Sequence, residues 1–482
     1  MGSNYPTPSL EEAPELSFRV LSDDSAAGPV LAFFGSAVVW LLVGTVFGLT
    51  ASLKFNFPDW LSSYPALTFG RVRPAHLNSV IYGWASLALA GCYIWLTARL
   101  CRTEVYWRKL LYISAILWNT GVLYGVISIL SGHSQGIEWL EFPQSVQILI
   151  TMAAVFLSLS ILRTFHSRQV KHIYVSLWYI LASVVWFPIL YILANTNMSI
   201  YSGVTGAAVN WWYAHNILTV WFTPAGLAAA YYFIPKVIGR PIHSYYLSLL
   251  GFWTFALFYN WNGIHHLIGG PLPTWLISIS IVASVLMFIP VIAVAINHHL
   301  TMVGHFGKLK FSPTLRFVVF GAMCYTAVSF QGSIQALRSF NEISHFTHYT
   351  VGHAHLGVYA FVTMILFGAI YYIMPRLLKW EWPYPILIKF HFWLVALGIT
   401  LYVIAMQIGG IIEGLYMNDV SRPFMEVVEV TKPYLFARSV AGVLILLGHL
   451  FFIYIFILMV TRKGTIRLTP PWREEEVEAS ST

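Results

Sequence analysis

The chain has 482 residues, of which 58% are hydrophobic and only 10% are charged. Soluble domains carry about 25% charged residues, so this composition excludes a soluble protein and indicates an integral membrane protein. The formal net charge of +8 is scattered over short loops, which argues against nucleic-acid binding, because that function needs a concentrated basic patch.

Twelve apolar segments approach or exceed the length of about 20 residues that a membrane span needs. They predict one all-helical membrane domain over residues 28–463, between a polar cytoplasmic segment (1–27) and a tail (464–482) expected to be disordered. No cleavable signal peptide is predicted, because no basic stretch precedes the first apolar segment. The expected spans are 28–52, 75–100, 107–132, 145–163, 173–195, 207–235, 245–268, 273–298, 316–340, 350–377, 385–412 and 435–461.

Loop charges predict the orientation, since positive loops stay in the cytoplasm. Lys and Arg lie in the loops after the second, fourth, sixth, eighth and tenth spans, and the loops after the third, fifth and seventh have none. Both termini are therefore expected in the cytoplasm. Arg71, Arg73, Arg338 and Arg438 break the rule, either as interfacial anchors or because they bind an anionic group.

Of the histidines in these spans, six share a similar depth: His76, His215, His265, His266, His353 and His355. Polar residues inside a membrane are costly and usually functional. His353 and His355 point to opposite flanks of one helix, because residues two apart differ by about 200° around the axis. His355 can therefore pair with His76 on a six-coordinate haem suited to electron transfer, while His353 holds a second haem with an open position.

The remaining three histidines offer imidazoles that suit copper, iron or zinc and leave one coordination position open. The adjacent pair His265-His266 can reach one metal if the helix loosens, which Asn262-Gly263 would allow. Tyr259 lies seven residues before His266 and shares its helix face. Tyr245 and Ser248 continue that stripe toward the cytoplasm, either as a proton path or as ordinary membrane-helix residues.

No haem-attachment motif is present: Cys92, Cys101 and Cys324 form neither C-x-x-C-H nor C-x-x-C. Any covalently bound c-type haem must therefore belong to a partner.

Over about residues 30–460 the chain resembles the catalytic subunit I of the cbb3-type haem–copper cytochrome c oxidases. The resemblance rests on 70–76 (Gly-Arg-Val-Arg-Pro-Ala-His), 211–216 (Trp-Trp-Tyr-Ala-His-Asn), Tyr259 with His265-His266, Ser344-His345, and 352–355 (Gly-His-Ala-His). It implies a fold of about twelve transmembrane helices in a bacterial inner membrane, reduction of dioxygen to water, and proton pumping.

The resemblance also implies roles for single residues. His76 and His355 would bind low-spin haem b, His353 high-spin haem b3, and His215, His265 and His266 copper B. Tyr259 would be a redox-active tyrosine cross-linked to His215. Residues near the haem propionates would be Arg73, Trp211, His345 and Arg438, and the proton path would hold Tyr245, Ser248 and Tyr325. Electrons would come from membrane-anchored monohaem and dihaem c-type cytochrome subunits. An outer-loop glutamate, Glu138 or Glu141, would bind calcium.

Nitric oxide reductases share the six histidines but bind non-haem iron with nearby glutamates. Their signature glutamate would fall at Thr219, and Tyr259 belongs to the oxidase pattern, so the oxidase is favoured. Three departures from that pattern remain: Gln331 replaces a glutamate, Ile264 a proline and His348 an aspartate. A permease would not explain the histidines, and a haem-bearing gas sensor would not need the copper ligands.

Overall fold

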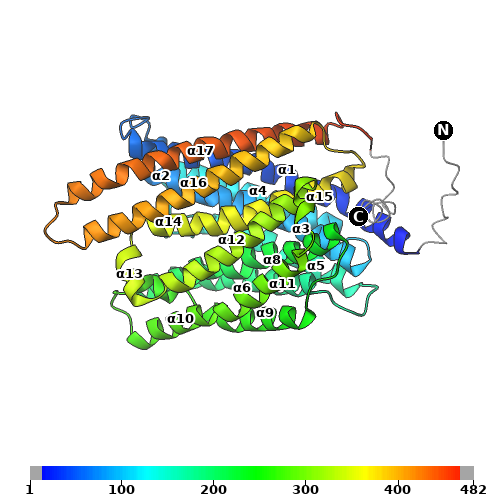
Figure 1. Cartoon of the computed structure of the whole chain (residues 1–482), viewed down its shortest axis with the longest axis horizontal. Coiled ribbons are helices and arrows are strands. Elements are labelled where there is room, and N and C mark those ends of the chain that lie inside the picture. The colour runs from blue at the N-terminus through cyan, green and yellow to red at the C-terminus, as the bar shows by residue number, and fades with distance from the viewer. Residues whose placement is uncertain (1–13, 467–482) are drawn as a thin grey trace.

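The computed structural model describes residues 14–466 and shows an all-helical bundle whose helices run along one common direction (Figure 1). Its only β pairing in that range is a single bridge between Trp380 and Ile466. Eleven helices of the described chain are long and apolar enough to cross a membrane. The prediction of an all-α membrane protein is therefore confirmed.

Successive spans are joined by short connections. The bounds of the helices are α1 (Pro14–Asn56), α2 (Phe69–Asn78), α3 (Ser86–Cys101), α4 (Arg108–Leu130), α5 (Gln144–His166), α6 (Val175–Ile200), α7 (Gly203–Ile217), α8 (Thr223–Ile238), α9 (Tyr245–Phe258), α10 (Thr274–Leu286), α11 (Phe288–Met302), α12 (Pro313–Gln335), α13 (Arg338–Ser344), α14 (His348–His355), α15 (Met364–Leu378), α16 (Pro385–Met417) and α17 (Phe424–Val460). Four spans each consist of two consecutive helices: α2 with α3, α7 with α8, α10 with α11, and α14 with α15.

Two expected segments differ from the structure. The segment predicted as the span 245–268 is the helix α9, which already ends at Phe258 and gives way to two short 3-10 turns. Helix α1 begins at Pro14, so residues 14–27 of the predicted polar segment are helical. The expected disorder of the tail concerns mostly residues 467–482, which lie outside the described part of the chain.

Three spans are interrupted by π-helical segments just after a histidine. Ser79–Ala85 follows His76, Leu218–Phe222 follows His215, and Leu356–Thr363 follows His355. Segments of this kind are rare and occur mostly at functional sites. They join α2 to α3, α7 to α8 and α14 to α15.

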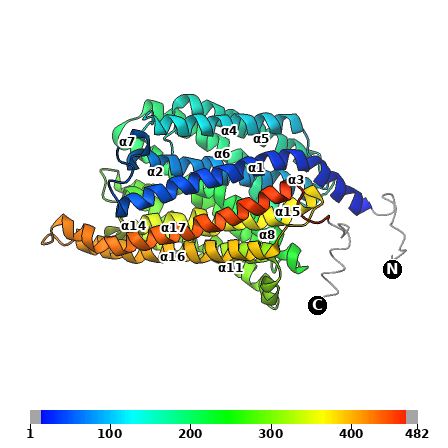
Figure 2. The same cartoon turned by 90° about the horizontal axis from the view of Figure 1, so that it is seen from above.

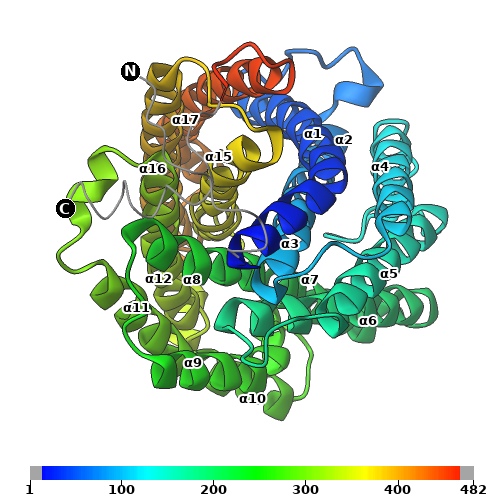
Figure 3. The same cartoon turned by 90° about the vertical axis from the view of Figure 1, so that its right-hand side faces the viewer.

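These three interrupted spans form the centre of the bundle. In the most apolar stretch of each interrupted span, 94%, 94% and 83% of the residues are buried. In the other spans this buried share does not exceed 56%. The view from the end in Figure 3 shows α3, α8 and α15 enclosed by the remaining helices. The histidines predicted as ligands on these spans therefore lie in the protein interior.

Both described chain ends lie at the same end of the bundle, together with the basic loops (Figures 1 and 2). Arg99 pairs with Asp23 at 3.1 Å, and the backbone N–H of Gln169 donates to the carbonyl of Cys101. At the opposite end, α16 and α17 extend beyond the other helices (Figure 2). The basic loops thus gather on one side, as the predicted topology requires.

Candidate metal centre and haem pockets

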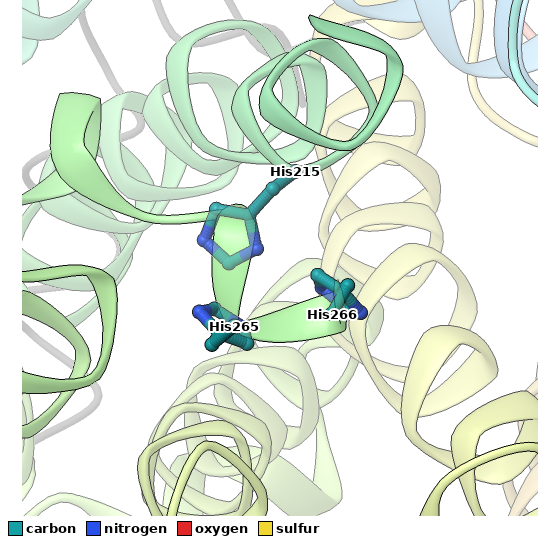
Figure 4. Close-up of side chains that lie close together, drawn as sticks. All are labelled: His215, His265 and His266. Atoms are coloured by element: carbon teal, nitrogen blue, oxygen red, sulfur yellow. The ribbon is translucent and has the colours of Figure 1, made fainter. Parts of the chain in front are cut away.

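His215, His265 and His266 come together into one cluster (Figure 4). His215 lies on α7, and the pair lies on the 3-10 turn Ile264–Leu267. One ring nitrogen from each residue lies within 4.8 Å of the others. The Nε2 atom of His215 is buried without a hydrogen-bond partner, and such atoms usually have one. The cluster therefore fits a single metal ion.

Serines on α10 hold the first histidine of the pair. The backbone N–H of His265 donates to Ser280 Oγ at 3.0 Å, and its Nδ1 lies 3.1 Å from both Ser280 Oγ and Ser284 Oγ. The indole of Trp211 stacks on His266, with centroids 4.5 Å apart. These contacts restrict how both rings can rotate, as the partners of metal ligands commonly do.

Gly263 lets the turn approach α7 closely. Its φ of +110° lies in a region that side chains disfavour. A Cβ atom here would lie 2.6 Å from the carbonyl oxygen of Trp211 and 3.0 Å from the Cβ of His215. The predicted loosening of the helix at Asn262-Gly263 is confirmed. It lets the turn that carries the histidine pair pack closely against α7.

Replacing Gly263 by alanine is expected to displace His265 and His266 from His215, because the added atom collides with backbone that cannot move aside. Metal content per chain should fall to less than half, measured by elemental analysis. Gly269→Ala is the matched control, since Gly269 also has a positive φ of +87° but open space around it. Equal metal content in both variants would contradict this role.

His76 and His355 face each other with nearly parallel rings. Their centroids lie 6.3 Å apart and their planes differ by 11°. Two metal–nitrogen bonds of about 2 Å plus the two ring radii span roughly this distance. His76 Nδ1 donates to the Gly44 carbonyl at 2.7 Å, and His355 Nδ1 to the Val351 carbonyl at 2.9 Å. The Nε2 atom of each ring is left free to bind iron.

His353 lies on the other flank of α14. Its Nδ1 donates to Gln331 Oε1 at 2.9 Å, which leaves Nε2 free. Every residue from 353 to 359 is only partly buried, although Met364–Met374 farther along the span are buried. This run of accessible residues inside the bundle fits a bulky planar group beside the helix.

The residues predicted near haem propionates are spread over the end opposite the termini. Arg73 pairs with Glu138. The guanidinium of Arg438 lies 5.6 Å from the ring centroid of Tyr402, which in turn stacks on His355 at 4.4 Å. Burial lowers the pKa of His345, whose ring stacks on Phe346.

The predicted hydroxyl stripe is part of a longer polar network. Tyr245 lies 2.8 Å from His172 Nε2 at the basic end, and Ser248 Oγ accepts from Asn297 Nδ2 at 2.9 Å. Asn297 also reaches the hydroxyl of Tyr231 at 3.4 Å. His172, Tyr231 and Asn297 were not predicted, because nothing in their local sequence separates them from structural polar residues.

The end of the hydroxyl stripe away from the basic loops, at Tyr259, lies beside the metal cluster. The rings of Tyr259 and His215 have centroids 6.1 Å apart. Tyr325 is buried with its hydroxyl unpartnered, and its ring packs against Phe361. Among the described residues, the hydroxyls of Tyr245 and Ser248 are not hydrogen-bonded to each other, and Ser248 is joined instead to Asn297 of α11.

Two departures from the oxidase pattern, the position of the reductase glutamate and a candidate calcium ligand have distinct surroundings. Thr219 is buried and donates to the carbonyl of Asn216, so no carboxylate adjoins the metal cluster from that position. His348 Nδ1 lies 2.7 Å from Glu413 Oε2, whose oxygen also accepts the first N–H of α14. Ile264 is simply buried. Glu141 accepts from Asn78 Nδ2 at 3.0 Å, and burial raises its pKa to about 7.

Comparison with known proteins agrees with this architecture over most of the chain. The sequence model of the family described as cytochrome c and quinol oxidase polypeptide I matches residues 28–444. The cbb3-type cytochrome c oxidase subunit CcoN1 of Stutzerimonas stutzeri is 34% identical over 86% of this chain and 91% of that protein. The cytochrome c oxidase subunit 1 homolog of Agrobacterium tumefaciens (strain T37) is 32% identical over 87% and 81%, respectively.

A solved structure has the same fold. A chain from a haem–copper terminal oxidase dimer superimposes with a TM-score of 0.72 at 16% identity, covering 92% of this chain and 84% of that chain. Cytochrome c oxidase subunit 1 of Rhodobacter capsulatus is 31% identical over 90% of this chain and 85% of that protein.

Proposed function

The chain belongs to the cytochrome c and quinol oxidase polypeptide I family, as a cbb3-type catalytic subunit of a haem–copper terminal oxidase, and from this premise we propose which residues hold its cofactors. His76 and His355 bind low-spin haem b, and His353 binds high-spin haem b3. His215, His265 and His266 bind copper B. The observation that supports this most strongly is the three-imidazole cluster, together with the parallel His76–His355 pair on one flank of α14 and His353, bonded to Gln331, on the other.

When bound, the haem irons and copper supply the binding and four-electron reduction of dioxygen to water. The chain's own residues position these groups and deliver protons. Gly44, Val351 and Gln331 each accept the Nδ1 proton of a haem-binding histidine, so the Nε2 lone pair is available for iron. Tyr259, beside His215, is placed to give up one electron and one proton. Whether it is covalently joined to His215 stays a prediction.

Protons reach the site through the network of Tyr245, Ser248 and Asn297, with Tyr231 and Tyr325 continuing toward Tyr259. Removing the Ser248 hydroxyl (Ser248→Ala) is expected to slow oxygen consumption roughly tenfold or more without changing haem content, because it breaks the link to Asn297. The check is turnover at saturating reductant in H2O and D2O. Thr254→Val is the control, since this α9 hydroxyl is exposed and bonds only to its own helix; a similar loss there would contradict the path.

Gln331 has a role other than proton release, which its amide cannot perform at ordinary pH. Its carbonyl orients His353. Gln331→Glu should strengthen this bond by about 1 kcal/mol and lower the midpoint potential of high-spin haem by about 40 mV, at 59 mV per tenfold change for one electron.

The measurement for Gln331 is a spectroelectrochemical titration over a range of pH. In the glutamate variant the shift should vanish at low pH, where the carboxyl group is protonated and neutral. Gln331→Met, of similar size without an acceptor, should move the potential upward. Unchanged potentials in both variants would remove the proposed role.

The protein is a multi-pass membrane protein, and we propose that it lies in a bacterial inner membrane with both termini in the cytoplasm. The gathering of the basic loops at the terminal end supports this orientation. The proposed partners are membrane-anchored monohaem and dihaem c-type cytochrome subunits, membrane lipids and dioxygen, and proton pumping accompanies the reaction. Calcium stays a prediction: Glu138 is paired with Arg73, and Glu141 with Asn78.

Metal and haem analysis of the purified complex tests the assignment. The expected result is two b-type haems and one copper per chain, with oxygen consumed when a reduced c-type cytochrome is supplied. Two b-type haems with an additional non-haem iron and no copper would instead make the chain a nitric oxide reductase. The neutral Thr219 beside the cluster argues against that result, because iron sites favour an added carboxylate ligand.

A further inference from the structure

A tyrosine on the span that carries His353 and His355 pairs with a buried histidine, outside the cluster and path described above. The hydroxyl of Tyr359, in the π-helical segment Leu356–Thr363, is 2.6 Å from Nε2 of His449 on α17. His449 is 1% exposed. Its Nδ1 lies 2.8 Å from the Thr45 hydroxyl of α1. Three separate segments thus meet in one short chain of hydrogen bonds.

The direction of these hydrogen bonds is fixed. Thr45 donates its only hydroxyl proton to the carbonyl of Leu41, at 2.6 Å. It must therefore accept from His449, whose Nδ1 carries the ring proton. The Nε2 atom then holds a lone pair, and Tyr359 donates to it. A phenol donating to a neutral imidazole is the arrangement in which a tyrosine can lose an electron and pass its proton to a neighbour.

Tyr359 is also close to the proposed haems. It lies four residues after His355, a rise of roughly 6 Å along the span. It is the last of the partly accessible residues 353–359 that line the interior space. A second tyrosine–histidine pair, Tyr371 with His391 Nδ1 at 2.8 Å, lies on the same span sixteen residues after His355, a rise of roughly 24 Å. Electron transfer falls steeply with distance, so of the two tyrosines Tyr359 is the one nearer to the haem-binding histidines along the span.

We propose that Tyr359 is a second redox-active tyrosine, which supplies an electron when low-spin haem has none to give; this inference rests on the proposed oxidase function. In the step, the O–H bond of Tyr359 breaks and an N–H bond forms at His449 Nε2. The electron goes to the oxidised haem–copper centre of the oxidase reaction. The products are a neutral tyrosyl radical and a protonated His449. An electron from the c-type cytochrome and the returning proton later restore both residues.

The test uses the purified holo-complex, oxidised and then mixed with hydrogen peroxide, which drives the centre to its oxidised state without added electrons. Samples are frozen within milliseconds and examined by electron paramagnetic resonance, with and without ring-deuterated tyrosine. The Tyr259→Phe background removes the radical expected from Tyr259. In that background we expect a tyrosyl signal that narrows on deuteration and falls to less than half in both Tyr359→Phe and His449→Gln.

Tyr371→Phe is the matched control, since it removes a buried phenol with the same kind of partner, and it should leave the signal unchanged. A signal that persists in Tyr359→Phe and His449→Gln, or its absence from the Tyr259→Phe background, overturns the inference. Haem and copper content and oxygen consumption of the complex with native Tyr259 are measured alongside. If the complex holds two haems and copper and consumes oxygen but shows no Tyr359 radical, this inference alone is refuted. If copper is missing, the proposed function is refuted first.

Discussion

Replacing His265 by alanine is expected to remove copper from the purified complex while both b-type haems remain. The turn Ile264–Leu267 contributes two of the three imidazoles, and His265 is held by Ser280 and Ser284. Loss of a residue that merely supports a ligand costs 10–100-fold in metal affinity or activity, so loss of a ligand should lower oxygen consumption by more than about 100-fold. Elemental analysis and a haemochrome spectrum measure the two cofactors separately.

His298→Ala is the control for this variant. His298 on α11 is buried, and neither ring nitrogen has a hydrogen-bond partner. Its removal leaves a cavity of similar size without touching the cluster, so copper should stay bound. Copper retained in His265→Ala, or lost equally in His298→Ala, would show that the three-histidine cluster is not the metal site.

Replacing His355 by alanine is expected to remove the low-spin haem and leave high-spin haem and copper in place. His355 and His76 approach from opposite sides, and His353 on the other flank of α14 keeps its own contact with Gln331. Oxygen consumption with a c-type cytochrome as donor should fall by more than about 100-fold, because in the proposed function electrons would reach the catalytic pair through this haem. The haem content should drop from two to one.

Two further observations sharpen the test at His355. Added imidazole should restore part of the low-spin spectrum, since the vacated space matches the lost ring. His353→Ala should give the opposite spectrum, with low-spin haem kept and high-spin haem lost. If both variants lost the same haem, the assignment of one haem to each flank of α14 would be wrong.

Much of the fold can be predicted from the sequence because the chain crosses a membrane. A lipid environment leaves few options besides helices for a spanning chain, so long apolar segments with charged loops predict the all-α bundle directly. The same constraint makes the six histidines at one membrane depth conspicuous. The opposed flanks of His353 and His355 follow from helix geometry alone, and the motifs around them carry the family resemblance. Gly263 indicated that the helix would loosen before the histidine pair, but the sequence did not predict the close approach of Gly263 to Trp211.

Other features depend on segments that are distant in sequence. Gln331 comes from α12 and meets His353 on α14, so its role as an orienting acceptor was invisible in the sequence, where it read only as a lost carboxylate. Asn297 joins the stripe of Tyr245 and Ser248 because α11 packs against α9. Tyr359 and His449 are 90 residues apart. Local pattern determines where an apolar helix forms and which flank a residue takes, whereas the packing of helices decides which polar groups meet, because each buried donor must find its acceptor on a neighbouring segment.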